Sequence, residues 1–310
     1  MSATLDLIRS SVRSIRPTSQ RPAYRLRQSF HSMALEARLA ARQFQQCERM
    51  RPTIFVIGVQ KAGTTTLFDH LARHEQILPP IVKEVHYFDV AWNRGERWYN
   101  AHFPTTAEAM AGEDALGHKL LTFDTTPYYM FHPDVSRRVL DFSPGAKVIA
   151  LLRDPVARTW SHYWHERARG REHLPPMEAF LAEPERVPDP HNHVGSSRRE
   201  RIAHQHYSYC ARSEYDIQLR RWMELLPKQR ILCLKSEDLF TDPGASLARV
   251  SRFLEISAFA ETPSLTLNAG RYVHPPQDVR EWLQSRLAPS QQATRDLAGS
   301  EFSWTDDEQA

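Results

Sequence analysis

A buried strand, a glycine-containing loop and a helix constrain this chain more than any other feature. The segment 53–67, TIFVIGVQKAGTTTL, predicts a strand and a helix joined by a loop in which Lys61 lies between Gly58 and Gly63. A nucleoside triphosphate loop has the pattern G-x-x-x-x-G-K-[ST], with its lysine directly after the second glycine. Here that position is Thr64. The loop therefore predicts an anion site other than a standard triphosphate site, although a plain helix cap would use the same residue types.

Further apolar segments alternate with helical patterns along the chain. Strands are predicted at 118–124, 146–153 and 230–235, with a short one near 76–78, and helices at 33–50, 133–142, 155–170, 211–226 and 243–254. This alternation predicts an α/β fold, a P-loop-like doubly wound parallel sheet flanked by helices in a single domain, with its ligand at the carboxyl ends of the strands. The segment 184–206, rich in proline, histidine and arginine, is expected to be a long surface loop.

The N-terminal region has a different composition from the rest. Residues 7–35 contain no acidic residue and many arginines and serines. Such a segment suits either a disordered basic arm or an organelle transit peptide. We expect a basic arm and helix over 1–50, one domain over 51–304 and an acidic tail over 305–310. We expect a cytoplasmic protein, or an organelle protein if the basic segment is a transit peptide.

Composition argues against several classes of function. A net charge of +3 over 310 residues is too small to favour nucleic acid as a partner. No apolar run is long enough for a transmembrane helix. The three cysteines, Cys47, Cys210 and Cys233, are far apart and have no zinc spacing, and the histidines are scattered, so no metal site is expected.

A second anion site is indicated at the end of another strand. In LLRDPVARTWSHYW, residues 151–164, Arg153 follows a buried strand, Pro155 begins a helix and Ser161 lies two turns along it. The arginine and the hydroxyl suit a second phosphate. The alternative is a capped strand–helix junction in which Arg153 pairs with Asp154.

A possible proton acceptor lies in KEVHYFD, residues 83–89. Glu84, His86 and Asp89 are interspersed with aromatic residues, and apolar surroundings can give a carboxylate or imidazole a pKa suited to accepting a proton. The alternative is an exposed turn with ordinary charges.

Together these segments resemble the sulfotransferases that use 3′-phosphoadenosine 5′-phosphosulfate, and most of all the heparan sulfate glucosaminyl 3-O-sulfotransferases. GVQKAGTTTL is similar to the family's 5′-phosphosulfate loop, and LLRDPVARTWSHY to its 3′-phosphate motif. The blocks EVHYFD, GERWYNAHFP, TTPYYM, RSEY and AGRYVHP follow in the family's order, and FSW at 302–304 looks like its last strand. The resemblance covers roughly 53–304.

The resemblance implies a set of roles. Lys61, Ala62, Gly63, Thr64 and Thr65 would hold the 5′-phosphosulfate; Arg153 and Ser161 the 3′-phosphate, with Gly270 and Arg271 closing over it. Glu84 would be the general base, His86 and Asp89 would line the acceptor side, and His86 is the rival base. The reaction would be in-line transfer of a sulfuryl group to a hydroxyl or amine, without a metal ion.

Several departures bear on the acceptor. The family's E-K-T-P block reads DTTP from Asp124, and its K-G-R block reads AGR from Ala269, so two cations are missing. The disulfide hairpin and the Golgi anchor of the animal enzymes have no counterpart. A small-molecule or glycan acceptor, probably a carbohydrate, is expected. Candidate contacts for an anionic glycan are Arg167, Arg169, Arg171, Arg198, Arg199 and Arg201.

Two other functions compete with this interpretation. A P-loop kinase or NTPase would share the sheet and the glycines, but the sequence lacks a lysine after Gly63 and has Arg153 where a metal-binding aspartate would end the strand. A catalytically dead nucleotide- or glycan-binding module is the second alternative, and the presence of Lys61, Glu84 and Ser161 argues against it.

Overall fold

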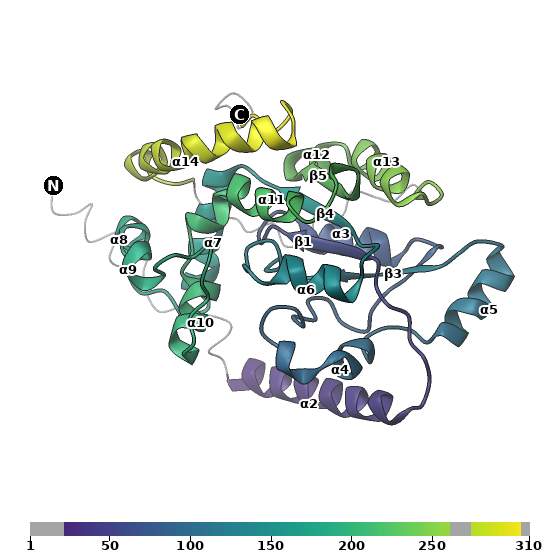
Figure 1. Ribbon diagram of the computed structural model, residues 1–310. Helices are drawn as coiled ribbons and strands as arrows, with labels where there is room; N and C mark the ends of the chain where they lie inside the picture. Colours follow the sequence, from purple (N-terminus) through teal and green to yellow (C-terminus); the bar gives the residue numbers. More distant parts are fainter. Residues whose placement is uncertain (1–21, 261–273, 305–310) are drawn as a thin grey trace.

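The computed structural model describes residues 22–260 and 274–304, with side chains from Met33 onward. Its centre is one parallel sheet with the strand order β2-β3-β1-β4-β5 (Figure 1). The strands are β1 (Ile54–Gly58), β2 (Ile77–Leu78), β3 (Leu121–Thr125), β4 (Lys147–Leu152) and β5 (Ile231–Lys235). The predicted α/β fold with a parallel sheet is confirmed, and each of the strands β1 to β5 lies within a few residues of a predicted strand.

Helices surround the sheet. The α-helices are α2 (Pro22–Phe44), α3 (Thr64–Ala72), α4 (Glu96–Asn100), α5 (Thr106–Leu116), α6 (Val135–Phe142), α7 (Pro155–Ala168), α8 (Pro176–Leu181), α9 (Glu183–Arg186), α10 (Arg198–His206), α11 (Tyr215–Met223), α12 (Ser236–Thr241), α13 (Pro243–Leu254) and α14 (Gln277–Ala298). Short 3-10 helices are η2 (Trp92–Arg94), η3 (Ala211–Ser213) and η4 (Lys228–Arg230). Within the described ranges, no helix has the length and apolar character needed to cross a membrane.

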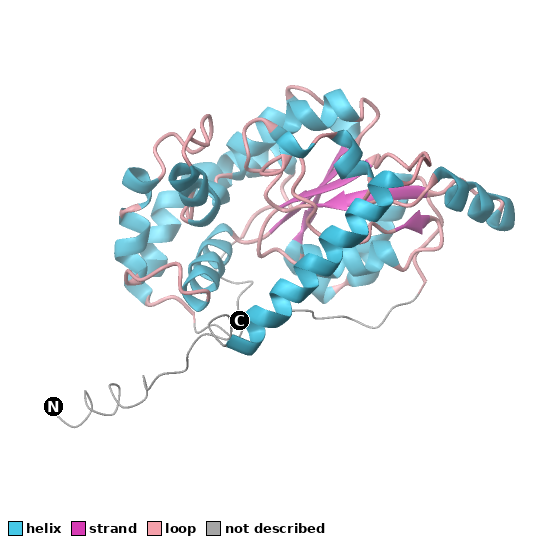
Figure 2. Cartoon of the chain, turned by 90° about the horizontal axis from the view of Figure 1, so that it is seen from below, coloured by secondary structure: helices cyan, strands magenta, loops and turns pink. Residues whose placement is uncertain are grey.

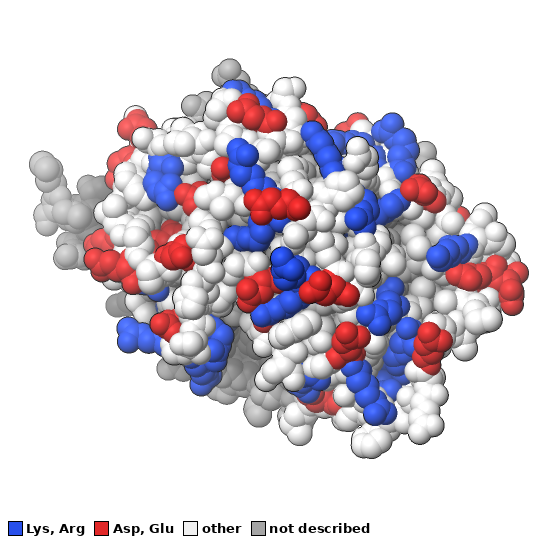
Figure 3. Space-filling model, in the orientation of Figure 1, with Lys and Arg blue, Asp and Glu red and all other residues white. Residues whose placement is uncertain are grey.

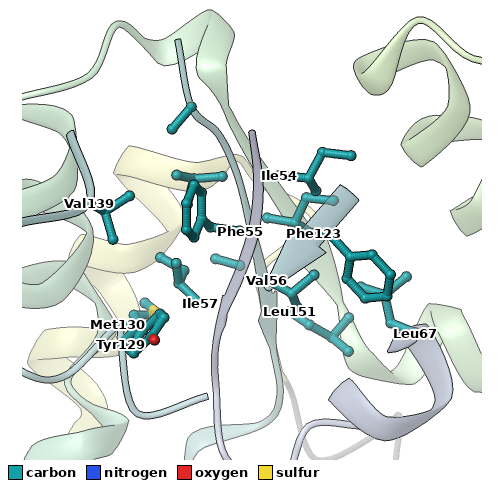
Figure 4. Close-up of a cluster of buried hydrophobic side chains, with 14 of the residues drawn as sticks. Ile54, Phe55, Val56, Ile57, Leu67, Phe123, Tyr129, Met130, Val139 and Leu151 are labelled. Carbon is teal, nitrogen blue, oxygen red and sulfur yellow. The ribbon is translucent and has the colours of Figure 1, made fainter. Parts of the chain in front are cut away.

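Strand β1 is buried on both faces, as its uninterrupted apolar sequence predicts. Figure 4 shows Phe55 on the same side as Val139 of α6, whereas Ile54 lies on the side of Leu67 of α3. All four side chains are at most 1% exposed. Helices α3 and α6 therefore cover opposite faces of the sheet.

This arrangement positions the site. Because α3 follows β1 and α6 follows β3, the loops after these neighbouring strands leave toward opposite faces and diverge at the carboxyl edge, where ligands bind in open α/β sheets. The loop after β1 is also held to the next strand, since the N–H of Val59 donates to the carbonyl of Leu151, 2.7 Å away. The loops after β1, β3 and β4 thus begin side by side.

The N-terminal helix is longer than the sequence indicated. It begins at Pro22, inside the basic segment, and not at 33, and it ends at Phe44 and not at 50. Figures 1 and 2 show it running along the outside of the domain beside α4. Arg42 fixes it there, because its Nε donates to the carbonyl of Ala101 at 2.6 Å.

Two other local predictions were wrong. The expected loop 184–206 contains α10, whose first turn is closed by a reciprocal capping box between Ser197 and Glu200. The expected last strand at 302–304 is irregular chain, although Phe302 is buried in the core. The long helix α14 had no prediction, and it accommodates Pro289 in its interior.

The C-terminal residues anchor the chain beside the site. Phe302 is 1% exposed, and the Nε1 of Trp304 donates to Glu237 Oε2 at 3.1 Å. We expect Phe302→Ala to lower the free energy of unfolding by about 3–5 kcal/mol, because it removes a buried ring and leaves a cavity. Urea denaturation measures this. Phe44→Ala is the matched control, since Phe44 is 85% exposed and should change stability by no more than about 0.5 kcal/mol. Equal effects of the two variants would contradict the packing.

Candidate functional site

The loop between β1 and α3 has a backbone that is unusual in two places. Lys61 has a φ of 75° and Gly63 has a φ of 84°. A left-handed conformation is unfavourable for lysine, and such residues concentrate at ligand-binding sites. The two turns bring the chain into α3, where Gly63 is the N-cap.

The N-terminus of α3 is open. Gly63 provides no side-chain cap, and within the described residues no hydrogen bond uses the N–H groups of Gly63, Thr64 or Thr65. Free N–H groups and the positive end of the helix dipole favour an anion at this position. Gly63 is thus the N-cap without a capping side chain, and this arrangement leaves room for an anion at the start of the helix.

Two other loops brace this one. Arg153, directly after β4, donates from Nη1 to the carbonyl of Lys61 at 2.9 Å, and Ser236 donates from Oγ to the carbonyl of Ala62 at 2.9 Å. The alternative pairing of Arg153 with Asp154 is not observed. Asp154 instead caps α7 by accepting from the N–H of Ala157 at 2.5 Å.

The pKa of Lys61 is lowered toward neutral pH. Burial, together with the positive charge of Arg153, lowers its pKa to about 8. A bound anion would favour the charged form and restore the proton. The lysine is thus arranged to gain more from binding an anion than an exposed lysine would.

The remaining predicted phosphate residues lie in different situations. Ser161 is buried in the second turn of α7, the helix that begins just after Arg153. Gly270 and Arg271 lie outside the described residues.

The segment 83–89 reaches the same edge of the sheet. The N–H of Glu84 donates to the carbonyl of Thr125, the last residue of β3, at 3.0 Å. Glu84 and His86 both have positive φ, at 61° and 56°. Non-glycine residues in this region are uncommon, and two of them so close together indicate a conformation held by its surroundings.

These side chains form a charged series. His86 Nδ1 lies 2.7 Å from Asp89 Oδ2, and His86 Nε2 lies 3.7 Å from Glu84 Oε2. Burial would lower the pKa of His86, but the two carboxylates outweigh it and raise the pKa to about 10. Burial would likewise raise the pKa of Glu84, but His86 and the neighbouring Lys83 lower it to about 2. At neutral pH we therefore infer an imidazolium beside an ionised, 42% exposed Glu84 side chain.

Asp124, where the related block has glutamate, is fully buried below this segment. Its Oδ2 accepts hydrogen bonds from the hydroxyls of Tyr99 and Tyr129, both at 3.0 Å, and burial raises its pKa to about 6. The Tyr129 hydroxyl also accepts from the N–H of Tyr87 at 3.0 Å. Asp124 therefore supports the 83–89 segment from behind.

Sequence reasoning missed the contribution of the segment after β5. Ser236 braces the loop, and the ring of Phe240 packs against Gly63. The predicted strand at 230–235 offered a signal, since residues following a parallel strand reach the same edge as the other loops. It also missed the hydrogen bond from Arg212 to Gln60, although the block RSEY, which begins at Arg212, was part of the family resemblance.

The described part of the chain contains no group of three or more histidine, cysteine, aspartate or glutamate side chains that could hold a metal ion. Its buried carboxylates near the loop are occupied by protein donors, as Asp124 and Asp154 illustrate.

Comparison with known proteins identifies the family. Residues 51–269 match the sulfotransferase domain family, which is more than half of the chain. The chain belongs to this family, and it is a sulfotransferase.

Individual relatives are distant and longer. The membrane-associated sulfotransferase kil1 of Dictyostelium discoideum is 24% identical over 82% of this chain and 66% of its own. The heparan sulfate glucosamine 3-O-sulfotransferase 6 of Mus musculus is 25% identical over 83% of this chain and 74% of its own. The crystal structure of a sulfotransferase from Alicyclobacillus acidocaldarius is similar with a TM-score of 0.60 and 25% identity, covering 80% of this chain and 96% of that one. All three names describe sulfotransferases.

Gly63 offers a test of the loop geometry. A β-carbon there would lie 2.7 Å from Cζ of Phe240, in addition to the strain of a positive φ. The positive φ alone should cost about 1–2 kcal/mol, and we expect Gly63→Ala to destabilise the protein by more than this because of the contact with Phe240. The variant should also bind adenosine 3′,5′-bisphosphate at least tenfold more weakly. Calorimetric titration and thermal unfolding measure these effects.

Gly117→Ala is the matched control. Gly117 also has a positive φ, 69°, but nothing lies within 4 Å of its would-be β-carbon. This variant should show the strain alone and unchanged nucleotide affinity. If both alanine variants bind the bisphosphate as the unmodified protein does, the loop is not the binding site.

Proposed function

We propose that this sulfotransferase transfers the sulfuryl group of 3′-phosphoadenosine 5′-phosphosulfate to a hydroxyl or amine of a carbohydrate acceptor by in-line displacement, with Glu84 as base. One observation carries the proposal: the open N-terminus of α3 beside Lys61 lies at the same sheet edge as Glu84. A donor anion and a proton acceptor can then meet at this edge of the sheet.

The loop suits the charge of this donor. The terminal sulfonate carries one negative charge, and the adjoining 5′-phosphate another. Lys61 and the N–H groups of Gly63, Thr64 and Thr65 can neutralise these charges without a metal ion, and such fixed donors stabilise charge on a leaving group. Ala62 contributes backbone close to the 5′-phosphate.

The 3′-phosphate is assigned to Arg153 and Ser161. Support comes from their places at the end of β4 and in the second turn of α7, and from the hydrogen bond that ties Arg153 to the loop. By the family resemblance, Gly270 and Arg271 would complete this subsite.

Glu84 is the better base of the two candidates. With a pKa raised to about 10, His86 already holds a proton at neutral pH and cannot accept another. Glu84 is ionised and has an exposed side chain. Its low pKa is no obstacle if the acceptor loses its proton only as the S–O bond forms, because the acceptor is then strongly acidic. His86 would orient the carboxylate.

The carbohydrate acceptor is supported by the names of relatives, several of which are heparan sulfate sulfotransferases. Of the arginines considered for an anionic glycan, Arg171 is occupied by the buried Glu166 at 2.8 Å. On the face shown in Figure 3, basic and acidic side chains are interspersed, so that face offers no extended basic surface.

Three further assignments are part of the proposal. Residues 51–304 form the transferase unit, with a basic arm and helix before it and an acidic tail over 305–310. A cytoplasmic location is proposed on the absence of an apolar transmembrane run in the sequence, with an organelle as the alternative. No metal ion is required.

Removal of Arg153 tests the donor assignment. Charge-assisted hydrogen bonds contribute about 1.5–3 kcal/mol each, so Arg153→Ala should weaken binding of adenosine 3′,5′-bisphosphate by about one to two orders of magnitude. Adenosine 5′-phosphate, which lacks the 3′ group, should lose far less. Calorimetry with both ligands decides the matter, and an equal loss for both would show that Arg153 acts only by bracing the loop.

Removal of the base tests the chemistry. Glu84→Gln keeps the shape of the side chain but not its ability to accept a proton, so kcat should fall by about 10²–10⁴ while donor affinity changes little. Parallel kinetics of His86→Asn provide the comparison. If the histidine variant loses kcat and Glu84→Gln does not, His86 is the base.

The pH dependence gives an independent test. Because Glu84 has a pKa of about 2, kcat/KM should be flat between about pH 5 and 7. It should fall above about pH 8, where Lys61 loses its proton in the free protein. Lys61→Arg should move this fall to higher pH, since arginine keeps its charge. A rate that climbs toward pH 10 would instead indicate neutral His86 as the base.

A further inference from the structure

Arg212, in η3, is a buried cation with unused hydrogen-bonding capacity. It is 4% exposed, and its guanidinium lies over the ring of Tyr128, 4.5 Å from the centroid. Its Nη1 donates to Oε1 of Gln60, the residue before Lys61, at 2.7 Å. Its Nε and Nη2 are buried and have no partner in good hydrogen-bond geometry among the described residues, and the guanidinium interacts only weakly with the nearby hydroxyl of Tyr128. Part of the guanidinium is thus left to bind something else.

The backbone around Arg212 is held firmly. The buried carboxylate of Glu183 accepts from the N–H groups of Cys210, at 2.6 Å, and Ala211, at 2.9 Å. On the other side, Ser213 Oγ donates to the carbonyl of Pro155 at 3.1 Å, at the start of α7. Because the backbone is already fixed, little conformational entropy would be lost when a ligand binds to Arg212, and this favours a role in recognition.

No protein anion neutralises Arg212. Within the part of the chain that the structure describes, no carboxylate lies within ion-pair distance of it, and Glu166 and Asp89 act on it only from farther away. The hydroxyl of Tyr128 is engaged by Nδ1 of His204 at 2.6 Å. A buried positive charge without a counter-ion is unfavourable, so an anionic group of a ligand would stabilise the charge of Arg212.

We propose that Arg212 determines acceptor specificity by binding an anionic group, a carboxylate or sulfonate, on the acceptor. The inference rests on the proposed function. In that function the donor's own anionic groups are assigned to Lys61, the N-terminus of α3 and Arg153. Arg212 contacts the loop through its hydrogen bond to Gln60. It also interacts electrostatically with Asp89, which lies in the 83–89 segment together with the proposed base, Glu84. We therefore place Arg212 on the acceptor side of Lys61.

The test uses a matched pair of sugars, methyl β-D-glucuronide and methyl β-D-glucoside, which differ by one carboxylate. Saturation-transfer NMR with the full chain saturated by adenosine 3′,5′-bisphosphate gives both affinities. We expect the glucuronide to bind about 10–100-fold more tightly than the glucoside, as for a charge-assisted hydrogen bond. Arg212→Gln should abolish this preference, and Arg212→Lys should retain part of it, with unchanged thermal unfolding for the lysine variant.

Two outcomes would overturn the proposal. In one, the unmodified protein binds the glucuronide no more tightly than the glucoside; in the other, Arg212→Gln still prefers the glucuronide. If Arg212→Gln weakens the sulfonated donor relative to the bisphosphate, the anion belongs to the donor and the acceptor assignment is wrong. Binding of adenosine 3′,5′-bisphosphate to the unmodified protein is measured separately. Its absence would refute the proposed function, whereas its presence without a sugar preference refutes only the role of Arg212.

Discussion

The hydrogen bond from Arg153 to the carbonyl of Lys61 joins the loops that follow the two central strands of the sheet. It fixes the unfavourable backbone of Lys61 and leaves the N-terminus of α3 open. The same arginine follows β4, so the loop proposed for the donor's sulfonate end and the residue proposed for its 3′-phosphate are parts of one unit. In the proposed function, the pairing of β1 with β4 would set the distance between the two anionic groups of the donor.

The second requirement is a proton acceptor at the same edge. Asp124 supports the 83–89 segment through Tyr129, and the backbone of Glu84 is tied to the end of β3. Asp89 then holds His86 as a cation, and His86 holds Glu84 as an anion. Each group is held by its neighbour, and such support would keep the proposed base, Glu84, in one geometry.

The sequence predicted those parts of the structure that depend on local patterns. Apolar runs located β1, β4 and β5, and the helix expected after the loop that contains Lys61 is α3, which begins at Thr64. Features that depend on distant contacts could not be found this way. Arg212 contacts Gln60 although 152 positions separate them in the sequence, and α10 is stabilised by a capping box and by the buried contact of His204 with Tyr128. Phe302 is buried without being in a strand, and Pro289 concealed α14 because proline usually interrupts a helix.

The central claim is that this loop binds a bisphosphorylated donor by protein charges alone. Calorimetric titration of the full chain with adenosine 3′,5′-bisphosphate in excess EDTA, and with ATP and Mg²⁺ in a second series, tests it most directly. The account predicts that the bisphosphate binds equally well with and without EDTA and much more tightly than the ATP–Mg²⁺ complex. Loss of bisphosphate binding in EDTA with recovery on adding Mg²⁺, or tighter binding of ATP–Mg²⁺, would contradict it.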